Sequence, residues 1–176
     1  KLINGINKIA NAVGSTLGAS GKTVIIEDDF GGPQVTKDGV TVANSILLQE
    51  PIENLAVSMM KQAAQKTAAV AGDGTTTSIV LTKAIIDYYY AAKGQEHSFR
   101  DIRKGIELYK DHIIKILDDK ATPVENEKLE QVSTISANND IELGSIIAEA
   151  FNQAGDNGVV TMETSPTSDT YINAVQ

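Results

Sequence analysis

The most informative part of this chain is the stretch Val70-Ala71-Gly72-Asp73-Gly74-Thr75-Thr76-Thr77-Ser78. It places one carboxylate between two glycines, followed by three threonines at the start of an apolar helical run. A helix N-terminus offers unpaired N–H groups and a partial positive charge, so it attracts phosphate. Glycines let a ligand approach the backbone closely, and an Asp can bind the divalent ion that phosphates carry. The stretch therefore predicts a nucleotide site, with a simple glycine turn and a threonine N-cap as the alternative.

Two helices are expected to flank this loop. Pro51 suits the first turn of a long helix before it, with an apolar face made of Leu55, Met59, Ala63, Thr67 and Val70. The two adjacent methionines of this helix are interpreted as core filling. After the loop, a second helix is predicted from Thr75 to Gly94, with its apolar residues at Ile79, Val80, Ile85 and Ile86.

The residues before these helices predict a helix and a hairpin. Apolar residues recur at alternating steps of four and three positions, at Leu2, Ile6, Ile9 and Val13. This spacing indicates a helix with one buried stripe, which should end near residues 14–18. Residues 23–26 and 34–36 are short strand-like runs, and the segment 28–33 between them has turn chemistry.

The residues after the second helix predict a third helix and then a mixed region. Ser98-x-x-Asp101 resembles a capping box, and the apolar spacing that follows it is sufficient for packing antiparallel to a neighbouring helix. Residues 121–123 end that helix and mark a domain boundary. Beyond it we expect helical segments at 126–132 and 140–154, a turn at 155–158 and a strand at 159–163. The inward residues of the second segment are predicted to be Ile141, Ile147, Ala148 and Phe151.

Length and composition exclude several classes of protein. The 176 residues suffice for one domain and part of a second. A formal net charge of −8 disfavours nonspecific binding to nucleic acid or to an anionic membrane. The chain has no cysteine, and no apolar run approaches the roughly 20 residues of a membrane span. We therefore expect a soluble, cytoplasmic protein, and both ends of the chain read as cut from a longer one.

Four co-linear segments resemble one family. Residues 72–77 are similar to the phosphate-binding signature of the chaperonins, ring-shaped ATP-driven folding machines. Three further matches follow the same order, Thr16-Leu17-Gly18, Thr36-Lys37-Asp38-Gly39-Val40 and Thr134-Ile135-Ser136-Ala137-Asn138. The last two resemble the group I (GroEL-type) branch.

The resemblance implies a mainly α-helical fold with a small β-hairpin. Residues 1–121 would form the N-terminal half of the ATP-binding equatorial domain, and residues 122–176 the first part of an α+β intermediate domain. The apical domain and the return segments would be absent.

The resemblance also implies the roles of individual residues. Asp38 would be the catalytic carboxylate that faces the γ-phosphate, and Asp73 the Mg²⁺ ligand. The nucleotide would be bound by Thr16, Leu17, Gly18, Lys37, Asp73, Gly74, Thr75, Thr76, Thr77 and Ser136. A K⁺ ion would be held by Thr16, Lys37 and Thr76. Asp140 matches an acid whose salt bridges control ring movements.

The chain departs from the family in two ways. The family usually reads Thr-Leu-Gly-Pro-x-Gly, whereas residues 16–21 lack the proline, which predicts a looser loop. The family's second catalytic Asp lies in the return half, so the 176-residue piece alone is predicted to be inactive. Gly21-Lys22-Thr23 is not a Walker A loop. That motif requires a glycine where this chain has Thr16, and it requires a helix to follow, whereas here a strand is predicted.

The resemblance implies an ATP-dependent chaperonin subunit, with ATP, Mg²⁺ and K⁺ as cofactors. Its partners would be further copies in heptameric rings, non-native polypeptides and a co-chaperonin, with no nucleic acid and no membrane. Two alternatives stay open: a non-catalytic assembly fragment that keeps subunit contacts, and a helical scaffold with a coincidental glycine loop.

Overall fold

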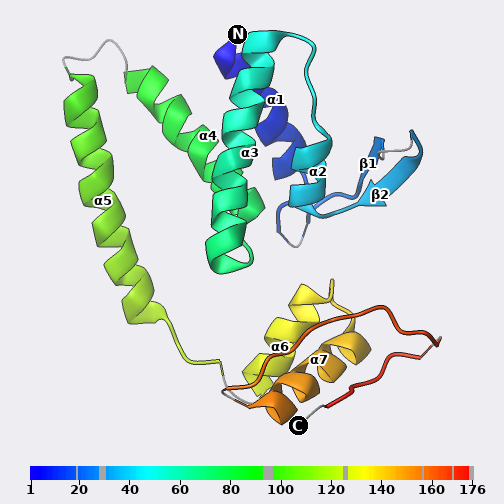
Figure 1. The fold of residues 1–176 in the computed structure, drawn as a ribbon. Helices are drawn as coiled ribbons and strands as arrows, with labels where there is room; N and C mark the ends of the chain where they lie inside the picture. The colour runs from blue at the N-terminus through cyan, green and yellow to red at the C-terminus, as the bar shows by residue number, and fades with distance from the viewer. Residues whose placement is uncertain are drawn as a thin grey trace. The chain divides into compact units, whose positions relative to one another are not determined.

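The structure is a computed structural model that describes residues 1–18, 20–27, 31–92, 97–124, 127–155, 157–167 and 169–174. Its elements, in chain order, are α1 (Leu2–Gly14), β1 (Val24–Glu27), β2 (Pro33–Thr36), α2 (Gly39–Ser45), α3 (Pro51–Ala71), α4 (Thr75–Ala92), α5 (Phe99–Lys120), α6 (Glu127–Ser136) and α7 (Ile141–Ala154) (Figure 1). The prediction of a mainly helical fold with a small hairpin is confirmed. The chain divides into two compact units, Lys1–Glu107 and Leu108–Gln176, and the predicted domain limit at residue 121 stays a prediction.

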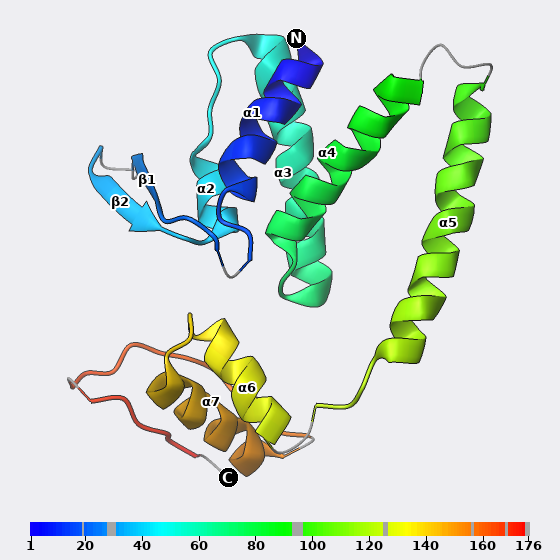
Figure 2. The ribbon, with the colours of Figure 1, turned by 180° about the vertical axis from the view of Figure 1, so that it is seen from behind.

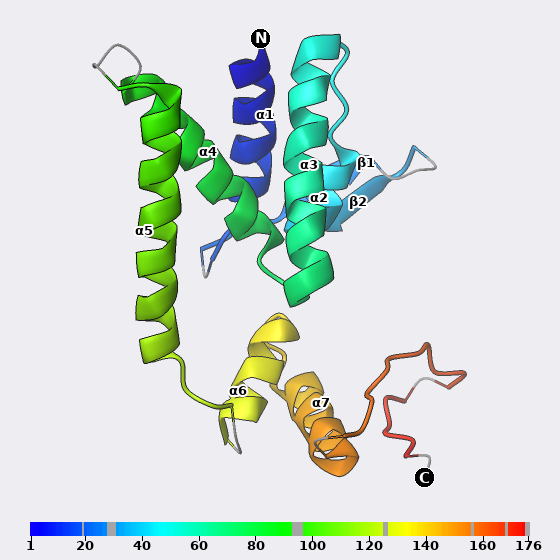
Figure 3. The ribbon, with the colours of Figure 1, turned by 60° about the vertical axis from the view of Figure 1, so that its left-hand side comes forward.

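The core of the first unit lies between α1, α2, α3 and α4. Figures 2 and 3 show α1 beside α3, with α4 crossing them and α2 beside the C-terminal end of α1. Its buried apolar side chains are Ile9, Ala10, Val13, Val42, Ala43, Val57, Met60, Ala64 and Ile79. The stripe predicted for α1 is confirmed at Ile9 and Val13, whereas Leu2 is exposed.

The inward face of α3 differs from the predicted one. Met60 is only 3% exposed, as expected of core filling, but Met59 is 62% exposed, and Leu55 and Val70 also face solvent. The buried face therefore lies about one residue further round the helix. The reason is the close approach of α1, where a Cβ on Gly5 would lie 2.2 Å from the Glu53 carbonyl oxygen. The small side chains of α3 suit such a crossing, and the larger ones point outward.

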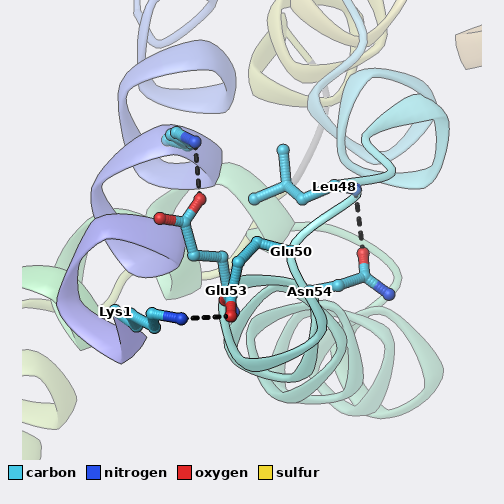
Figure 4. A network of polar contacts seen from close by, with 6 residues as sticks. Lys1, Leu48, Glu50, Glu53 and Asn54 are labelled. Carbon is cyan, nitrogen blue, oxygen red and sulfur yellow. Dashed lines mark hydrogen bonds and ion pairs between the residues drawn. The ribbon is translucent and has the colours of Figure 1, made fainter.

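Polar contacts join the start of α3 to α1 (Figure 4). Glu50 is the N-cap of α3 and accepts a 2.7 Å hydrogen bond from the Glu53 N–H, so the predicted start at Pro51 is confirmed. Lys1 pairs with Glu50 at 2.9 Å, and Lys8 with Glu53 at 2.5 Å. The hydrogen bond from Lys1 is the main cause that lowers the pKa of Glu50. Exposed ion pairs of this kind contribute little to the free energy of unfolding. Their main effect is to orient the start of α3 against α1.

The hairpin is present as predicted. β1 and β2 pair antiparallel, from Val24 opposite Thr36 to Glu27 opposite Pro33. Val24 and Ile26 pack against the core, whereas the other face of the ribbon is exposed. The predicted turn 28–33 lies partly outside the described residues.

Helices α4 and α5 begin where the sequence predicts. α4 starts at Thr75 and buries Ile79, whereas Ile85, another apolar residue of this helix, is exposed; the predicted end at Gly94 lies outside the described residues. The Ser98 Oγ accepts a 3.2 Å hydrogen bond from the Asp101 N–H at the start of α5. No residue of α5 is buried, so its predicted packing against a neighbouring helix is wrong for the described residues. Apolar spacing identifies a shared face but does not supply a partner for it.

The second unit contains a helix pair. α6 and α7 cross so closely that a Cβ on Gly144 would lie 2.5 Å from the Thr134 Cα. Ala148 is buried as predicted and Ile147 half-buried, but Ile141 and Phe151 are exposed because the close crossing lies on the face of Gly144 and Ala148. The predicted first helical segment is the longer α6, and its predicted first residue, Asn126, lies outside the described residues.

The predicted strand 159–163 is wrong, because this segment is described without regular structure. A strand needs a neighbouring edge for its N–H and C=O groups. The turn before it is described except for Asp156. Within the described ranges, no helix combines the length and apolar character that crossing a bilayer requires.

Candidate nucleotide-binding site

The glycine loop joins α3 to α4 through two left-handed residues. Gly72 is the C-cap of α3 at φ 74°, and its N–H donates to the Ala68 carbonyl at 2.8 Å. Gly74 has φ 84°, and its N–H donates to the Asp73 Oδ1 at 2.6 Å. Both φ values are strained for any residue with a Cβ. The two glycines therefore turn the chain sharply and leave Asp73 exposed at the loop.

The three threonines form the first turn of α4. Thr75 is buried, Thr76 is half-buried and Thr77 is exposed, so the turn runs from the core to the surface. The first N–H groups of an α-helix have no partner within the helix, and its dipole adds partial positive charge there. Behind the loop, Thr67 of α3 donates to the Ser78 Oγ at 3.2 Å, which ties the two flanking helices together. This arrangement can bind an anion such as phosphate.

The start of α2 lies directly against the start of α4. A Cβ on Gly39 would lie 1.8 Å from the Thr76 Oγ1 and 3.3 Å from a methyl carbon of Val13. Gly39 is buried, and only a residue without a side chain leaves room for this contact. The structure thus brings the Asp38-Gly39 motif to the threonine turn, although 37 positions separate Gly39 from Thr76 in the sequence.

Asp38 is the N-cap of α2. Its carboxylate accepts hydrogen bonds from the Thr41 N–H at 2.8 Å, the Thr41 hydroxyl at 2.5 Å and the Val40 N–H at 3.3 Å. Partial burial raises the pKa of Asp38, but the hydrogen bonds from Thr41 and Val40 outweigh it, and the net pKa is lower than the ordinary value. The carboxylate is therefore ionised at neutral pH.

The loop after α1 is held by hydrogen bonds to backbone carbonyl groups. Thr16 donates its hydroxyl to the Val13 carbonyl at 2.7 Å, and the Lys22 N–H donates to the Ser15 carbonyl at 2.8 Å. Gly18 has φ 77°, and a Cβ on Gly21 would lie 2.2 Å from the Thr16 carbonyl oxygen. Since Val13 also contacts Gly39, this loop leaves α1 next to the start of α2. Ala19, where the family's proline is missing, lies outside the described residues.

The structure gives less support to the roles of the remaining predicted site residues. Lys37 is exposed beside Asp38, and nothing in the structure tests the K⁺ role assigned to Thr16, Lys37 and Thr76. Ser136 belongs to the second unit, where it is the exposed last residue of α6. Asp140, in the same unit, accepts a 3.0 Å hydrogen bond from the Leu143 N–H and so caps α7. Their roles at the nucleotide and in salt bridges stay predictions.

Two features of the site are absent from the sequence-based prediction. One is α2 itself, whose signal was the N-cap residue Asp38 followed by the apolar pair Val42 and Ala43. The other is Lys61, which binds the far end of α2 and gives no signal in the sequence. In the structure Asp38 is the N-cap of this helix and Gly39 is its first residue.

Within the described ranges, no three His, Cys, Asp or Glu side chains gather closely enough to hold a metal ion by themselves. Mg²⁺ in nucleotide sites is usually bound by one or two carboxylates together with the phosphates. The exposed carboxylate of Asp73, at the mouth of a helix, fits that kind of site.

Comparison with known proteins identifies relatives of this chain. A sequence model of the TCP-1/cpn60 chaperonin family matches residues 9–173. The chaperonin gp146 from the bacteriophage EL 2 (Pseudomonas aeruginosa), crystallised in the presence of ATP-BeFx, is similar in structure with 31% sequence identity and a TM-score of 0.74. That match covers 89% of this chain and 28% of the bacteriophage chain.

A group III chaperonin in the open state shares the fold, with 23% identity and a TM-score of 0.73 over 88% of this chain and 31% of its own. This chain thus spans less than a third of the length of either chaperonin. The family match extends over nearly all of the sequence, including the glycine loop and the Asp38 helix. The chain belongs to the TCP-1/cpn60 chaperonin family.

Proposed function

We propose that a protein containing this chain is an ATP-dependent chaperonin subunit that binds ATP at the glycine loop and hydrolyses it. The observation that carries the proposal is the contact between Gly39 and Thr76, which brings the residue next to Asp38 against the first turn of α4. ATP hydrolysis needs neutralised phosphates and a carboxylate that orients the attacking water. The contact between α2 and α4 would bring together N–H groups that bind phosphate, at the start of α4, and a carboxylate, at the start of α2.

The two carboxylates have different parts. Asp73 is exposed in the loop and would hold Mg²⁺, which neutralises phosphate charge when bound. Asp38 is ionised, and among the described residues its Oδ1 accepts a long 3.3 Å bond from the Val40 N–H, which leaves that oxygen room to orient water. K⁺ at the backbone of Thr16 and Lys37, with Thr76, would add positive charge beside the phosphates.

The wider function follows from the family. We propose that ATP hydrolysis drives movements of a homo-oligomeric ring of seven subunits. The ring would enclose and release non-native polypeptides in the cytoplasm, and a co-chaperonin would assist it. The segments 36–40 and 134–138 favour the group I branch. Ser136 would approach the nucleotide from the intermediate domain, and Asp140 would form salt bridges during the ring movements.

A second candidate function is a non-catalytic assembly fragment that keeps subunit contacts. The observation in its favour is that α5 leaves Leu108, Tyr109 and Leu117 exposed, apolar side chains of the kind that a subunit contact covers. Steady-state phosphate release by the full-length protein that carries this chain distinguishes the two, because the assembly fragment would release none.

The division of labour between the carboxylates is tested by single substitutions in that full-length protein. Asp73→Ala should weaken binding of Mg·ATP and slow hydrolysis, because the phosphate charge is poorly neutralised. Asp38→Ala should keep near-normal affinity while hydrolysis slows by about ten-fold or more, as for a lost water-orienting group. Titration calorimetry with a non-hydrolysable ATP analogue is compared with phosphate release. Loss of analogue binding in Asp38→Ala, with binding intact in Asp73→Ala, would reverse the assignment.

A further inference from the structure

Lys61 of α3 binds the C-terminal end of α2. Its ammonium donates hydrogen bonds to the carbonyl oxygens of Asn44 at 2.9 Å and of Ile46, the C-cap residue, at 2.8 Å. Burial lowers the pKa of Lys61, so the ammonium is partly withdrawn from water where it makes these bonds. A cation at a helix C-terminus stabilises the unpaired carbonyls and the negative end of the dipole.

This contact is unlike those of other lysines on the described surface. Lys1, Lys8 and Lys83 pair with carboxylates, whereas no carboxylate lies within ion-pair distance of Lys61 among the described residues. Lys66, five residues further along α3, is exposed. The charge of Lys61 is therefore directed at the end of α2.

Helix α2 connects Lys61 to the candidate site. It has seven residues, so few of its backbone groups have partners within the helix. Its N-terminal end carries Asp38 and contacts Thr76, and its middle is buried through Val42 and Ala43. About two helical turns separate its ends, and a close-packed interior transmits strain, so a shift at one end displaces the carboxylate at the other.

We propose that Lys61 is a positioning residue for ATP hydrolysis, which holds α2 from its C-terminal end and thereby fixes the Asp38 carboxylate beside the threonine turn. The inference rests on the proposed hydrolysis at this site. Misplacement of a reacting group by about 1 Å can slow a reaction by about a hundred-fold, so a modest displacement of α2 has a measurable effect on turnover.

The test uses Lys61→Met in the full-length protein that carries this chain. We expect phosphate release to slow by about ten-fold while the affinity for a non-hydrolysable ATP analogue changes by less than about two-fold. Lys66→Met, which removes the same charge from the same helix, should match the unmodified protein. Lys61→Arg, which keeps the charge and the donors, should recover most of the rate.

A second comparison separates positioning from a general effect on folding. In an Asp38→Ala background, Lys61→Met should slow phosphate release no further, because the group that it positions is gone. Hydrogen exchange at the Val40 and Thr41 amides, which donate to Asp38, should quicken in Lys61→Met but not in Lys66→Met. If Lys61→Met does not fold, Lys61→Gln carries the same measurements.

Several results would overturn the inference. One is a rate of phosphate release in Lys61→Met equal to that in Lys66→Met, and another is a loss of analogue affinity in Lys61→Met as large as its loss of rate. A third is that Lys61→Met slows phosphate release in the Asp38→Ala background as much as it does in the unmodified protein. A fourth is that Lys61→Met leaves the exchange of the Val40 and Thr41 amides unchanged. Absence of ATP hydrolysis by the unmodified protein would instead overturn the proposed function, and the exchange measurement would still decide whether Lys61 holds α2.

Discussion

At the scale of single residues, the site depends on glycines for two different physical reasons. Gly72 and Gly74 have positive φ values, so a side chain there would strain the backbone. Gly39 has room only for a hydrogen, because the Thr76 hydroxyl occupies the place of a Cβ. The first reason can be read from a Gly-x-Gly pattern, whereas the second depends on a residue far along the chain.

Gly39→Ala should lower the free energy of unfolding of the first unit, by about 1–3 kcal/mol as for overpacked sites, and weaken analogue binding. The added methyl forces the Thr76 hydroxyl out of its place and lies against Val13. Urea unfolding and calorimetry measure the two effects.

The control is Gly105→Ala in the middle of α5, where a Cβ would meet no atom within 4 Å. This substitution should stabilise the helix by about 0.5–1 kcal/mol, because alanine loses less backbone entropy than glycine. A Gly39→Ala variant as stable as Gly105→Ala would show that the contact with Thr76 is unimportant.

At the scale of elements, the accuracy of the prediction depends on how local the signal is. The start of α3 at Pro51, the capping of α5 by Ser98 and the hairpin have local signals, and all three are present. α2 spans seven residues, fewer than the window over which helical periodicity becomes distinct. The buried face of α3 depends on where α1 crosses it, and alanines on both sides of that helix left the pattern ambiguous.

The same distinction holds for the site. The glycine loop and the acids could be found from residue types and order alone. The packing of Gly39 on Thr76 and the bonds from Lys61 could not, because they join residues whose sequence separation carries no pattern.

The N-cap of α2 makes a prediction about pH. The folded pKa of Asp38 lies below the ordinary value of 3.8, so the stability that its hydrogen bonds contribute is present above about pH 4 and is lost as pH falls through the folded pKa. Thr41→Val removes the hydroxyl donor and should raise the pKa of Asp38, measured by an NMR titration of its carboxyl carbon.

Ser45→Ala serves as the control, because Ser45 donates to the Val42 carbonyl at the other end of α2. It should leave the titration of Asp38 unchanged. A pKa of Asp38 that is the same in Thr41→Val as in the unmodified protein would contradict the assigned hydrogen bond.

At the scale of the whole molecule, the two carboxylates of the proposed site both belong to the first unit. Asp38 and Asp73 are both exposed in the first unit. Chaperonin-type hydrolysis needs closure that excludes water and aligns the reacting groups. A protein that consists of residues 1–176 alone should therefore show no ATP turnover at the rate of an intact chaperonin subunit.

Phosphate release by residues 1–176, in the presence of Mg²⁺ and K⁺, checks this expectation, and Asp73→Ala in the same chain defines the background. Turnover well above that background, at the rate of the full-length protein, would contradict it. Native mass spectrometry of the full-length protein tests the proposed ring, which a stable monomer with and without ATP would exclude.

The adjacent methionines of α3 give the first unit an internal oxidation reporter. Met59 has 62% of its surface exposed, whereas Met60 lies in the core with only 3% of its surface exposed. A mild oxidant converts accessible thioethers to sulfoxides, so the first sulfur reacts in the native state and the second reacts only when the helices separate. The ratio of the two sulfoxides within one peptide therefore records how often the core around α3 opens, without any label or substitution.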